Sequence, residues 1–387
     1  MSFIINSLLD TDFYIFTMGQ AVLHQFPGTT SKFRFKCRNE AKWTQEMVDR
    51  LTEHVQGFCN LKFTEEELNY LSSIRFLKSD YIDFLRLYHP QFRHITIELK
   101  GTELQISYEG PLYQIIYYEV PLLAMVNEIY FIFNPTKEHE SGLERLKNKA
   151  AALCGSKMNF RFSDFSTRRR HSFHMQERVV KTFAHQPHFS GTSNVYFAMK
   201  YGITPIGTMA HLWLQIGQAS NVRLIDSQKY MLQKWVDEYR GDLGIALTDI
   251  VGSDAFIRDF DLYFAKLYDG VRHDSGDPFE WGEKFIKHYE SLNIDPFTKV
   301  FTWSDGLDVW KALDLAESFG ERCMVNFGIG THFSNDFPDI IPLQIVIKMI
   351  ECNGQPVAKL SDSGGKAMCE DPQYEAYLKS VFRIGDK

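Results

Sequence analysis

Several features that mark other protein classes are missing from this chain of 387 residues. It contains no run of 18 apolar residues, so we expect no membrane-spanning helix. Its first six residues carry no positive charge and no cleavage motif, so we expect no secretory signal. The six cysteines are scattered without a CxxC pair, which disfavours a zinc site and predicts reduced thiols in a cytoplasmic protein. No internal repeat or low-complexity linker is present.

The chain also has fewer positive than negative side chains. It contains 42 Lys and Arg residues and 49 Asp and Glu residues, which gives a formal net charge of −7. This balance argues against general binding of nucleic acid. The content of 44% hydrophobic and 24% charged residues is ordinary for a globular protein with a large core. Aromatic residues reach 14%, with 32 Phe and 18 Tyr, which suits a chain that binds a flat ring.

The chain up to about residue 125 mixes helices with alternating strands. Residues 7–26 predict a helix capped near Asp10 or Thr11. Another helix is predicted after Thr64, because three glutamates follow it and negative charge suits the first turn of a helix. Residues 94–108 alternate between apolar and polar on both sides of a Gly-Thr pair, which predicts a hairpin.

From about Pro121 onward, helical stretches alternate with short apolar strands that end in polar, glycine-rich turns. Such alternation predicts a parallel sheet, and a barrel is its natural closure. After Ile341 the pattern becomes antiparallel, with two strands flanking Asn353-Gly354, a pair that favours a type I′ turn. We expect this tail to rejoin the N-terminal sheet. The clearest strands of the parallel part lie within residues 243–249, 299–305 and 323–331.

The segment Asp164–Arg170 is the most informative stretch, because it places three consecutive arginines shortly after Phe165 in an acidic protein. Guanidinium groups bind phosphate and carboxylate bidentately, so the cluster favours an anion site. A solvated basic turn is the alternative for an isolated cluster of this kind. Polar clusters further along the chain favour the anion site.

These clusters fall where predicted strands end, which is where barrels carry their chemistry. His211 follows a Gly-Thr turn and is a feasible phosphoryl acceptor or acid–base group. Asp277 precedes Pro278 as a helix cap would, which leaves Asp274 free to hold Mg²⁺ or sugar hydroxyls. Asp305 is a second carboxylate of this kind.

Two glycine-containing turns complete the set. Gly328, Gly330 and Thr331 form a turn whose backbone N–H groups can converge on a phosphate. The turn that contains Ser193 reads by itself as a helix cap, with ligand binding as the alternative. Together the clusters describe one pocket, suited to a phosphorylated sugar with a diphosphate and to a flat acidic base.

Several of these motifs, in the same order, resemble those of the nicotinate phosphoribosyltransferases. The resemblance runs from about Leu8 to about Asp371 and is carried by residues 9–14, 164–170, 191–195, 207–211, 272–277, 327–331 and 360–363.

The resemblance implies a type II phosphoribosyltransferase of the α/β class. An irregular TIM-like α/β barrel, residues 126–341, would carry the active site. An α/β sandwich would form from residues 1–125 and 342–387. The implied ligase-type reaction joins nicotinate to phosphoribosyl pyrophosphate, giving nicotinate mononucleotide and pyrophosphate in NAD salvage. ATP hydrolysis would be coupled to it through a phosphohistidine, with Mg²⁺ as cofactor.

The resemblance also assigns roles to single residues. Phe165 would stack on the pyridine ring, and Tyr14, supplied by the second subunit of a homodimer, would cover its other face. Arg168 would contact the ligand and act in catalysis, and Ser193, where the related nicotinamide enzyme has an aspartate, would spare the nicotinate carboxylate a repulsion. His211 would be the phosphorylated histidine.

Phosphoribosyl pyrophosphate would be held by a larger set of residues. Asp274, also a catalytic residue, and Asp305 would hold the ribose and, tentatively, Mg²⁺. The other members of the predicted set are Arg170, Arg272, Gly328, Gly330 and Thr331.

The chain departs from the family pattern in three places. Leu212 stands after His211 where the family usually has a glutamate, and we hypothesise weaker ATP coupling with basal transferase activity retained. Ser166 replaces a usual glycine, which narrows the approach to the ring. Residues 363–366 read Ser-Gly-Gly-Lys where Ser-Pro-Gly-Lys is expected.

Three other interpretations stand beside this one. The nearest is a nicotinamide-specific or broad pyridine phosphoribosyltransferase, which Ser193 disfavours. A barrel enzyme acting on a sugar phosphate without base transfer would leave Phe165 and Tyr14 without a role. An RNA-binding module using the arginine cluster is disfavoured by the net charge of −7.

Overall fold

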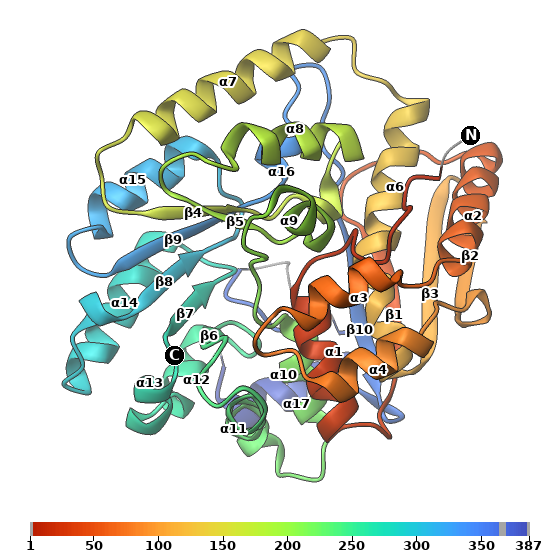
Figure 1. The fold of residues 1–387 in the computed structure, drawn as a ribbon. Coiled ribbons are helices and arrows are strands. Elements are labelled where there is room, and N and C mark those ends of the chain that lie inside the picture. The colour runs from red at the N-terminus through yellow and green to blue at the C-terminus, as the bar shows by residue number, and fades with distance from the viewer. Residues whose placement is uncertain (1–2, 364–368, 385–387) are drawn as a thin grey trace.

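The structure, a computed structural model, describes residues 3–363 and 369–384. A five-stranded antiparallel sheet and its helices lie beside a six-stranded parallel sheet that is flanked by helices (Figure 1). The predicted α/β class is therefore confirmed. Of the departures named above, residues 364–366 lie outside the described residues.

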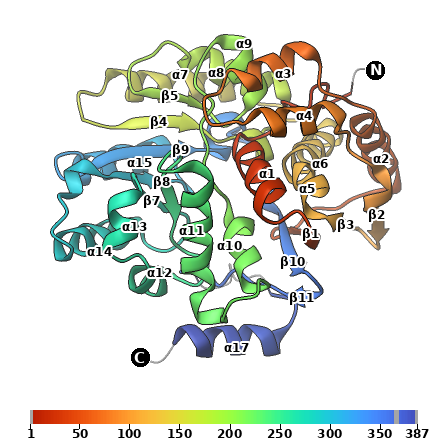
Figure 2. The same cartoon turned by 60° about the horizontal axis from the view of Figure 1, so that its bottom comes forward.

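The antiparallel sheet joins both ends of the chain. Its strand order is β11-β10-β1-β3-β2, so the late strand β10 pairs with the early strand β1, as predicted for the tail (Figure 2). The predicted hairpin around residues 101–102 is the β2–β3 pair. The strands are β1 (Thr30–Cys37), β2 (Ile95–Lys100), β3 (Glu103–Pro111), β10 (Ile345–Cys352) and β11 (Gln355–Pro356).

The hairpin between β10 and β11 has the predicted turn. Asn353 and Gly354 both have positive φ, 50° and 73°, as a type I′ turn requires. The returning strand is shorter than predicted, with only two residues paired. The chain leaves the sheet there because it crosses to the barrel, where the Leu360 N–H donates to the Ile250 carbonyl at 2.8 Å.

Helices of the N-terminal part pack against this sheet and against each other. A capping box opens α3, since Thr64 accepts from the Glu67 N–H and Glu67 accepts from the Thr64 N–H. The helices are α1 (Tyr14–Gln25), α2 (Gln45–Cys59), α3 (Glu65–Ser72), α4 (Ser79–Leu87), α5 (Leu112–Ile115) and α6 (Glu119–Phe133).

The predicted start of the first helix was wrong. Helix α1 begins at Tyr14, and residues 7–13 form an irregular turn instead. The expected cap, Asp10, does not cap a helix because its carboxylate accepts two hydrogen bonds from Arg170, 160 residues away. Tertiary ion pairing therefore overrides the local capping preference.

The parallel sheet has the strand order β5-β4-β9-β8-β7-β6 and carries the predicted strands of residues 243–249, 299–305 and 323–331. An irregular segment that contains Pro205 and Thr208 runs between the two outer strands, β5 and β6. Pro205 bridges to Thr192 next to β5, and the Thr208 hydroxyl donates to the Ile245 carbonyl of β6 at 3.0 Å. The strands are β4 (Arg161–Asp164), β5 (Phe189–Thr192), β6 (Ile245–Leu247), β7 (Gly270–His273), β8 (Val300–Trp303) and β9 (Met324–Ile329).

Helices of the second part connect these strands on the outside (Figure 1). Asp277 caps α14 with Pro278 in its first turn, as predicted. The helices are α7 (His139–Gly155), α8 (Phe173–Phe183), α9 (Val195–Tyr201), α10 (His211–Gln218), α11 (Ser227–Tyr239), α12 (Ser253–Asp259), α13 (Leu262–Leu267), α14 (Pro278–Ser291), α15 (Val309–Phe319), α16 (Thr331–Ser334) and α17 (Pro372–Phe382).

Helix α6 follows the first three strands of the antiparallel sheet in the sequence and precedes the strands of the parallel sheet. The predicted domain boundary at residues 125 and 126 falls inside this continuous helix, and the division into two domains stays a prediction. The stretch Leu112–Phe133 is long and apolar enough to cross a membrane, but 89% of its most apolar window is buried inside the protein, as in a core helix.

Candidate active site

A cavity of about 490 Å³ lies at the carboxyl ends of the parallel strands. Phe165, Arg168, Asp274 and Gly330, which follow β4, β7 and β9, all line it. The central prediction that these four residues face one cavity is therefore confirmed. The cavity is also lined by Arg272, Asp305 and Thr331 from the predicted set.

The lining of this cavity is strongly cationic for an acidic protein. Its carboxylates are Asp274 and Asp305. Its cationic side chains are Arg38, Arg168, Arg169, Arg272, Lys348 and Lys359. Such an excess of positive charge in a concave site favours a ligand with several negative charges.

A second, smaller cavity of about 40 Å³ shares a wall with the first. Tyr14, Glu119 and His211 line the smaller cavity only. The shared wall consists of Arg168, Arg272, Asp274 and Lys348. An anion in the large cavity would therefore lie within reach of the histidine cavity.

Tyr14 is 7% exposed, and its hydroxyl has no hydrogen-bond partner among the residues described. The Arg168 guanidinium lies 6.0 Å from the centre of its ring. The chain's own Tyr14 thus lies beside the site. That a second subunit supplies this tyrosine stays a prediction.

Two of the three arginines after Phe165, Arg168 and Arg169, line the large cavity, and Arg170 does not. Residues 167–169 form one turn of 3₁₀ helix, in which successive side chains diverge by about 120°. Arg168 faces the cavities and lies 3.5 Å from Glu119 and 3.7 Å from Asp12. Arg169 also lines the large cavity, and its Nε donates to the Ile345 carbonyl at 3.0 Å.

The prediction that Arg170 binds phosphoribosyl pyrophosphate is wrong. Its side chain is completely buried and donates to both Asp10 oxygens, at 2.6 and 2.8 Å. It also donates to Glu128 at 2.7 Å and to Gln176 at 3.2 Å. A guanidinium so enclosed cannot contact a ligand, and it instead ties the N-terminal turn and α6 to the barrel.

His211 is the first residue of α10 and is 5% exposed. Its Nε2 lies 2.8 Å from Asp249 Oδ1 and 3.6 Å from Asp274 Oδ2. A carboxylate only accepts hydrogen bonds, so Nε2 carries the proton of the neutral ring and Nδ1 carries the lone pair. The arrangement leaves a nucleophilic nitrogen on an oriented imidazole.

Burial and the nearby Lys359 lower the pKa of His211 to about 4, so the ring is neutral near pH 7. Burial alone would raise the pKa of Asp249, but Lys359 and His211 hold that pKa below its ordinary range. The Lys359 ammonium lies 2.9 Å from Asp249 and 3.4 Å from Asp274. The site is thus a network of alternating charges around a neutral histidine.

The sequence predictions did not include Asp249, Lys348 and Lys359. Asp249 ends the predicted strand of residues 243–249, and this position was the available indication. Lys348 is a single cation in the otherwise apolar strand Ile345–Ile350, an unusual place for a lysine. For Lys359 no local pattern indicated a role.

Phe165 and Gly328 form a packed pair. A Cβ atom added to Gly328 would lie 2.2 Å from the Phe165 ring, so only glycine admits the ring at this place. Gly328 is buried within β9 and does not line the large cavity. The prediction that Gly328 holds a phosphate is therefore wrong, and its role is to seat Phe165.

Ser193 lies behind the site. It is 4% exposed, and its hydroxyl donates to Asp12 Oδ1 at 2.6 Å. Ser193 lines neither cavity, and Asp12, to which it donates, lies 3.7 Å from Arg168. The neighbouring Asn194 caps α9, as the turn had predicted.

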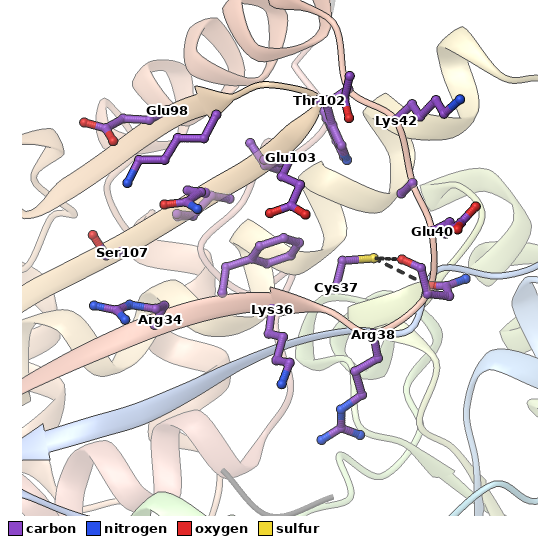
Figure 3. A pocket seen from close by; sticks show the side chains of 18 of the residues that line it. Arg34, Lys36, Cys37, Arg38, Glu40, Lys42, Glu98, Thr102, Glu103 and Ser107 are labelled. Atoms are coloured by element: carbon purple, nitrogen blue, oxygen red, sulfur yellow. Dashed lines mark hydrogen bonds between the residues drawn. The ribbon is translucent and has the colours of Figure 1, made fainter. Parts of the chain in front are cut away.

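A further cavity, of about 1100 Å³, lies over β1 and the β2–β3 hairpin (Figure 3). Its side chains carry both charges, as Lys36, Arg38, Glu98 and Glu103 show. Arg38 lines both this cavity and the one at the strand ends. None of the predicted site residues lines it, so it is not the candidate active site.

An α/β barrel with an aromatic ring, clustered cations and an oriented histidine at its strand ends defines an enzyme acting on an anionic substrate. Known proteins identify the enzyme more closely. The nicotinate phosphoribosyltransferase N-terminal domain model matches residues 9–127, and the nicotinate phosphoribosyltransferase family model matches residues 160–386. The chain belongs to the nicotinate phosphoribosyltransferase family.

Individual relatives agree with this assignment. The nicotinate phosphoribosyltransferase of Chromobacterium violaceum is 53% identical, and that of Burkholderia ambifaria is 52% identical. The matches cover 98% of this chain and 98% and 97% of the two relatives. The crystal structure of the Vibrio cholerae nicotinate phosphoribosyltransferase matches with a TM-score of 0.93 and 37% identity, over 98% of this chain and 94% of that one.

Proposed function

We propose that this chain joins nicotinate to phosphoribosyl pyrophosphate, giving nicotinate mononucleotide and pyrophosphate, and that ATP hydrolysis is coupled through a phosphorylated His211. The observation that carries the proposal is the single cavity in which Phe165, six cations and two carboxylates meet. The names of relatives more than 50% identical support the phosphoribosyl transfer to nicotinate.

Nicotinate presents a flat ring and one carboxylate. In the proposal the ring stacks on Phe165, which Gly328 holds in place, and the carboxylate pairs with Arg168. Arg168 is the member of the arginine cluster that faces both cavities. Ser193 acts indirectly, because its hydroxyl holds Asp12 against that arginine.

The transfer itself needs no protein nucleophile. The pyridine nitrogen attacks C1 of the ribose while the bond from C1 to the pyrophosphate oxygen breaks, and its electron pair leaves with pyrophosphate. Arg168 and Arg272 stabilise the charge that develops there, and Asp274 is proposed to face the ribose. Gly330 and Thr331, at the rim of the same cavity, are proposed to hold the 5′-phosphate.

Mg²⁺ is the proposed cofactor, and the donor set fits it because Asp274 and Asp305 line the same cavity. Together with phosphate oxygens, these two carboxylates would hold the ion, which would neutralise charge on the leaving pyrophosphate. Arg272 and Ser304 already donate to Asp274 Oδ1, at 3.2 and 3.1 Å, so its orientation is fixed before any ligand binds.

For ATP coupling, His211 Nδ1 attacks the terminal phosphorus of ATP and the bond to the bridging oxygen of ADP breaks. Water later hydrolyses the phosphohistidine to phosphate. Asp249 holds the ring in the tautomer that this step requires. Asp249 thus orients the imidazole although Leu212, the residue after His211, carries no charge.

Leu212 remains relevant to the strength of coupling. It is 5% exposed and lines the small cavity beside His211, where it offers no ligand to a cation. We propose that coupling is weaker in this chain for that reason and that basal transferase activity is retained. Phosphohistidine yield from radiolabelled ATP is the test, and a yield unchanged in Leu212→Glu would reject this part.

The remaining proposals concern the binding partners of the chain, its location in the cell and its metabolic role. We propose a homodimer that acts in the cytoplasm, in NAD salvage, with nicotinate, phosphoribosyl pyrophosphate and ATP as its small-molecule partners. We propose no nucleic-acid partner and no membrane association.

The experiment that tests the proposed function is mononucleotide formation from nicotinate and phosphoribosyl pyrophosphate, with and without ATP. Nicotinamide in the same assay tests the alternative of a nicotinamide or broad pyridine phosphoribosyltransferase. We expect product from nicotinate and much less from nicotinamide. Equal rates with the two bases would favour the alternative.

A further inference from the structure

Ser275 follows Asp274 in the turn after β7, is 1% exposed and lines neither cavity. Its hydroxyl donates to Asp249 Oδ2 at 2.6 Å. The other oxygen of the same carboxylate, Oδ1, lies 2.8 Å from His211 Nε2. Ser275 is therefore connected to the proposed phosphoryl acceptor through a single buried side chain.

The direction of the hydrogen bond from Ser275 is fixed by its second partner. The Asp362 N–H donates to Ser275 Oγ at 2.9 Å. A serine hydroxyl has one proton and a carboxylate only accepts, so the hydroxyl proton of Ser275 points to Asp249. A chain of three hydrogen bonds thus runs from the backbone of Asp362 to the imidazole of His211.

Asp362 belongs to residues 357–363, which follow β11 and cross from the antiparallel sheet to the barrel, and we call them the crossing segment. Within it, Ala358 exchanges two hydrogen bonds with Gln218 of α10, both at 2.8 Å. Its Leu360 bonds to the Ile250 carbonyl in the turn after β6. The crossing segment is therefore fastened to both elements that bring the histidine and its carboxylate partner together.

A second donor to Asp249 Oδ2 does not replace the serine. Lys359 Nζ lies 2.9 Å from that oxygen and 3.4 Å from Asp274 Oδ2. An ammonium is a compact point charge on a flexible stem, here shared by two carboxylates, so it balances the charge of Asp249 without fixing the plane of the carboxylate. The Ser275 hydroxyl is directional and sits in a buried turn, so it can fix that plane.

We infer that Ser275 is a positioning residue for the ATP-dependent step, because its hydroxyl fixes Asp249 so that Oδ1 accepts from His211 Nε2 and leaves Nδ1 free. Nδ1 then forms the bond to the terminal phosphorus of ATP, and the electron pair of the broken bond leaves with ADP. The Nε2 proton stays on the ring. The inference deepens the proposed function and rests on it for the phosphoryl transfer to His211.

The test compares the full chain with three variants. Ser275→Ala removes the hydroxyl, Ser275→Thr retains one, and Ser363→Ala is the matched control. The Ser363 hydroxyl accepts from the Gly276 N–H at 2.9 Å, so this variant loosens the same turn from the crossing segment without removing a hydrogen bond of Asp249. Melting temperatures of all variants verify folding.

The first measurement is the tautomer of His211 without any ligand, read from NMR spectra of the isotopically labelled ring nitrogens. His211→Gln assigns the signals. We expect the Nε2–H tautomer alone in the parent, in Ser275→Thr and in Ser363→Ala, and a mixture of both tautomers in Ser275→Ala. General loosening of the fold would move the signals of other histidines as well, so the tautomer reports the orientation of Asp249 directly.

The second measurement is phosphohistidine formation from radiolabelled ATP, compared with mononucleotide formation without ATP in the same variants. Ser275→Ala should form phosphohistidine roughly 5- to 50-fold more slowly, as expected for the loss of a hydrogen bond to a charged group. Its basal rate should fall by a smaller factor. Ser275→Thr and Ser363→Ala should stay within about threefold of the parent in both assays.

A single Nε2–H tautomer and the parent's rate of phosphohistidine formation in folded Ser275→Ala would overturn the inference. So would equal losses in Ser275→Ala and Ser363→Ala, because they would assign the effect to the attachment of the crossing segment. Absence of phosphohistidine from the parent would refute the ATP coupling of the proposed function, and the tautomer comparison would still decide the role of Ser275.

Discussion

At the scale of single residues, the site depends on which of several similar side chains reaches the ligand. Arg168 and Arg170 are two positions apart, yet one faces both cavities and the other is fully buried. The difference arises from the 3₁₀ turn and from the buried carboxylates of Asp10 and Glu128. Residue type alone therefore does not assign function within this cluster.

Replacing Arg170 should affect stability and not substrate binding. Arg170→Met leaves two buried carboxylates unpaired and should lower the free energy of unfolding by about 3–5 kcal/mol. Arg170→Lys, which keeps the charge but loses the fork, should give a smaller loss of the same sign. Denaturant unfolding measures both, with exposed Arg178→Lys as control. An unchanged unfolding midpoint would contradict the account.

Replacing Asp249 should affect the ATP-dependent step selectively. Asp249→Asn can donate to Nε2 and so favours the wrong tautomer of His211, and phosphohistidine formation should fall by roughly 10²-fold or more. Basal transfer without ATP should change far less. Exposed Asp254→Asn is the control, and full phosphohistidine yield in Asp249→Asn would refute the orienting role.

At the scale of elements, strand ends and short turns carry the site, and their neighbours fix its geometry. The turn after β4 carries Phe165 over β9, where Gly328 leaves room for the ring. Helix α6 packs against the same turn through Phe131, whose ring stacks on His171 at 5.0 Å. A substitution that alters either contact should therefore shift the turn that carries Phe165.

Gly328→Ala should displace the platform for the base. The added methyl group would overlap the Phe165 ring, so the KM for nicotinate should rise roughly 10- to 100-fold. The KM for phosphoribosyl pyrophosphate should change little. Gly28→Ala is a suitable control because no atom lies within 4 Å of the added carbon. A rise in the KM for phosphoribosyl pyrophosphate alone would return the phosphate role to Gly328.

His171 should make the contact between α6 and this turn sensitive to acid. Burial and the nearby His139 lower the pKa of His171 to about 4, against about 6.5 in an unfolded chain. As the pH falls from 6.5 toward 4, the unfolded state binds a proton that the folded state does not, so stability is lost in this window. The loss is at most about 3 kcal/mol.

Unfolding free energies measured between pH 7 and 4 test this expectation. His171→Phe, which preserves stacking, should remove this part of the acid dependence, and exposed His185→Phe should not. An identical slope in parent and His171→Phe would show that His171 does not titrate as stated.

At the scale of the whole molecule, the chain brings its two ends together beside a barrel built from its middle. The apolar strands and polar turns of residues 243–331 could be predicted because the period of the sequence and the position of each turn are local properties. The shared cavity of Phe165, Arg168, Asp274 and Gly330 followed from the rule that chemistry lies at strand ends. The order of the strands places these turns on one side.

The features that could not be predicted depend on contacts between distant residues. Helix α1 starts at Tyr14 and not at Asp10, because Asp10 pairs with Arg170. The space beside the Gly328 Cα atom is filled by the Phe165 ring. Lys348 reaches the site from β10 of the other sheet and Lys359 from the segment that follows β11, and no local pattern relates them to residue 211 or 274. Sequence reasoning therefore identifies the turns, and folding decides which side chains in them meet.

Arg168 lines both cavities. In the proposed reaction it also contacts both substrates, nicotinate and phosphoribosyl pyrophosphate. The most direct measurement is the initial rate of nicotinate mononucleotide formation by the parent chain and by Arg168→Met, with pyrophosphate determined in the same samples. We predict equimolar mononucleotide and pyrophosphate from the parent, and a fall in kcat/KM of roughly 10²-fold or more in a variant of unchanged melting temperature. Full kcat/KM in Arg168→Met, or pyrophosphate release without mononucleotide, would contradict the account.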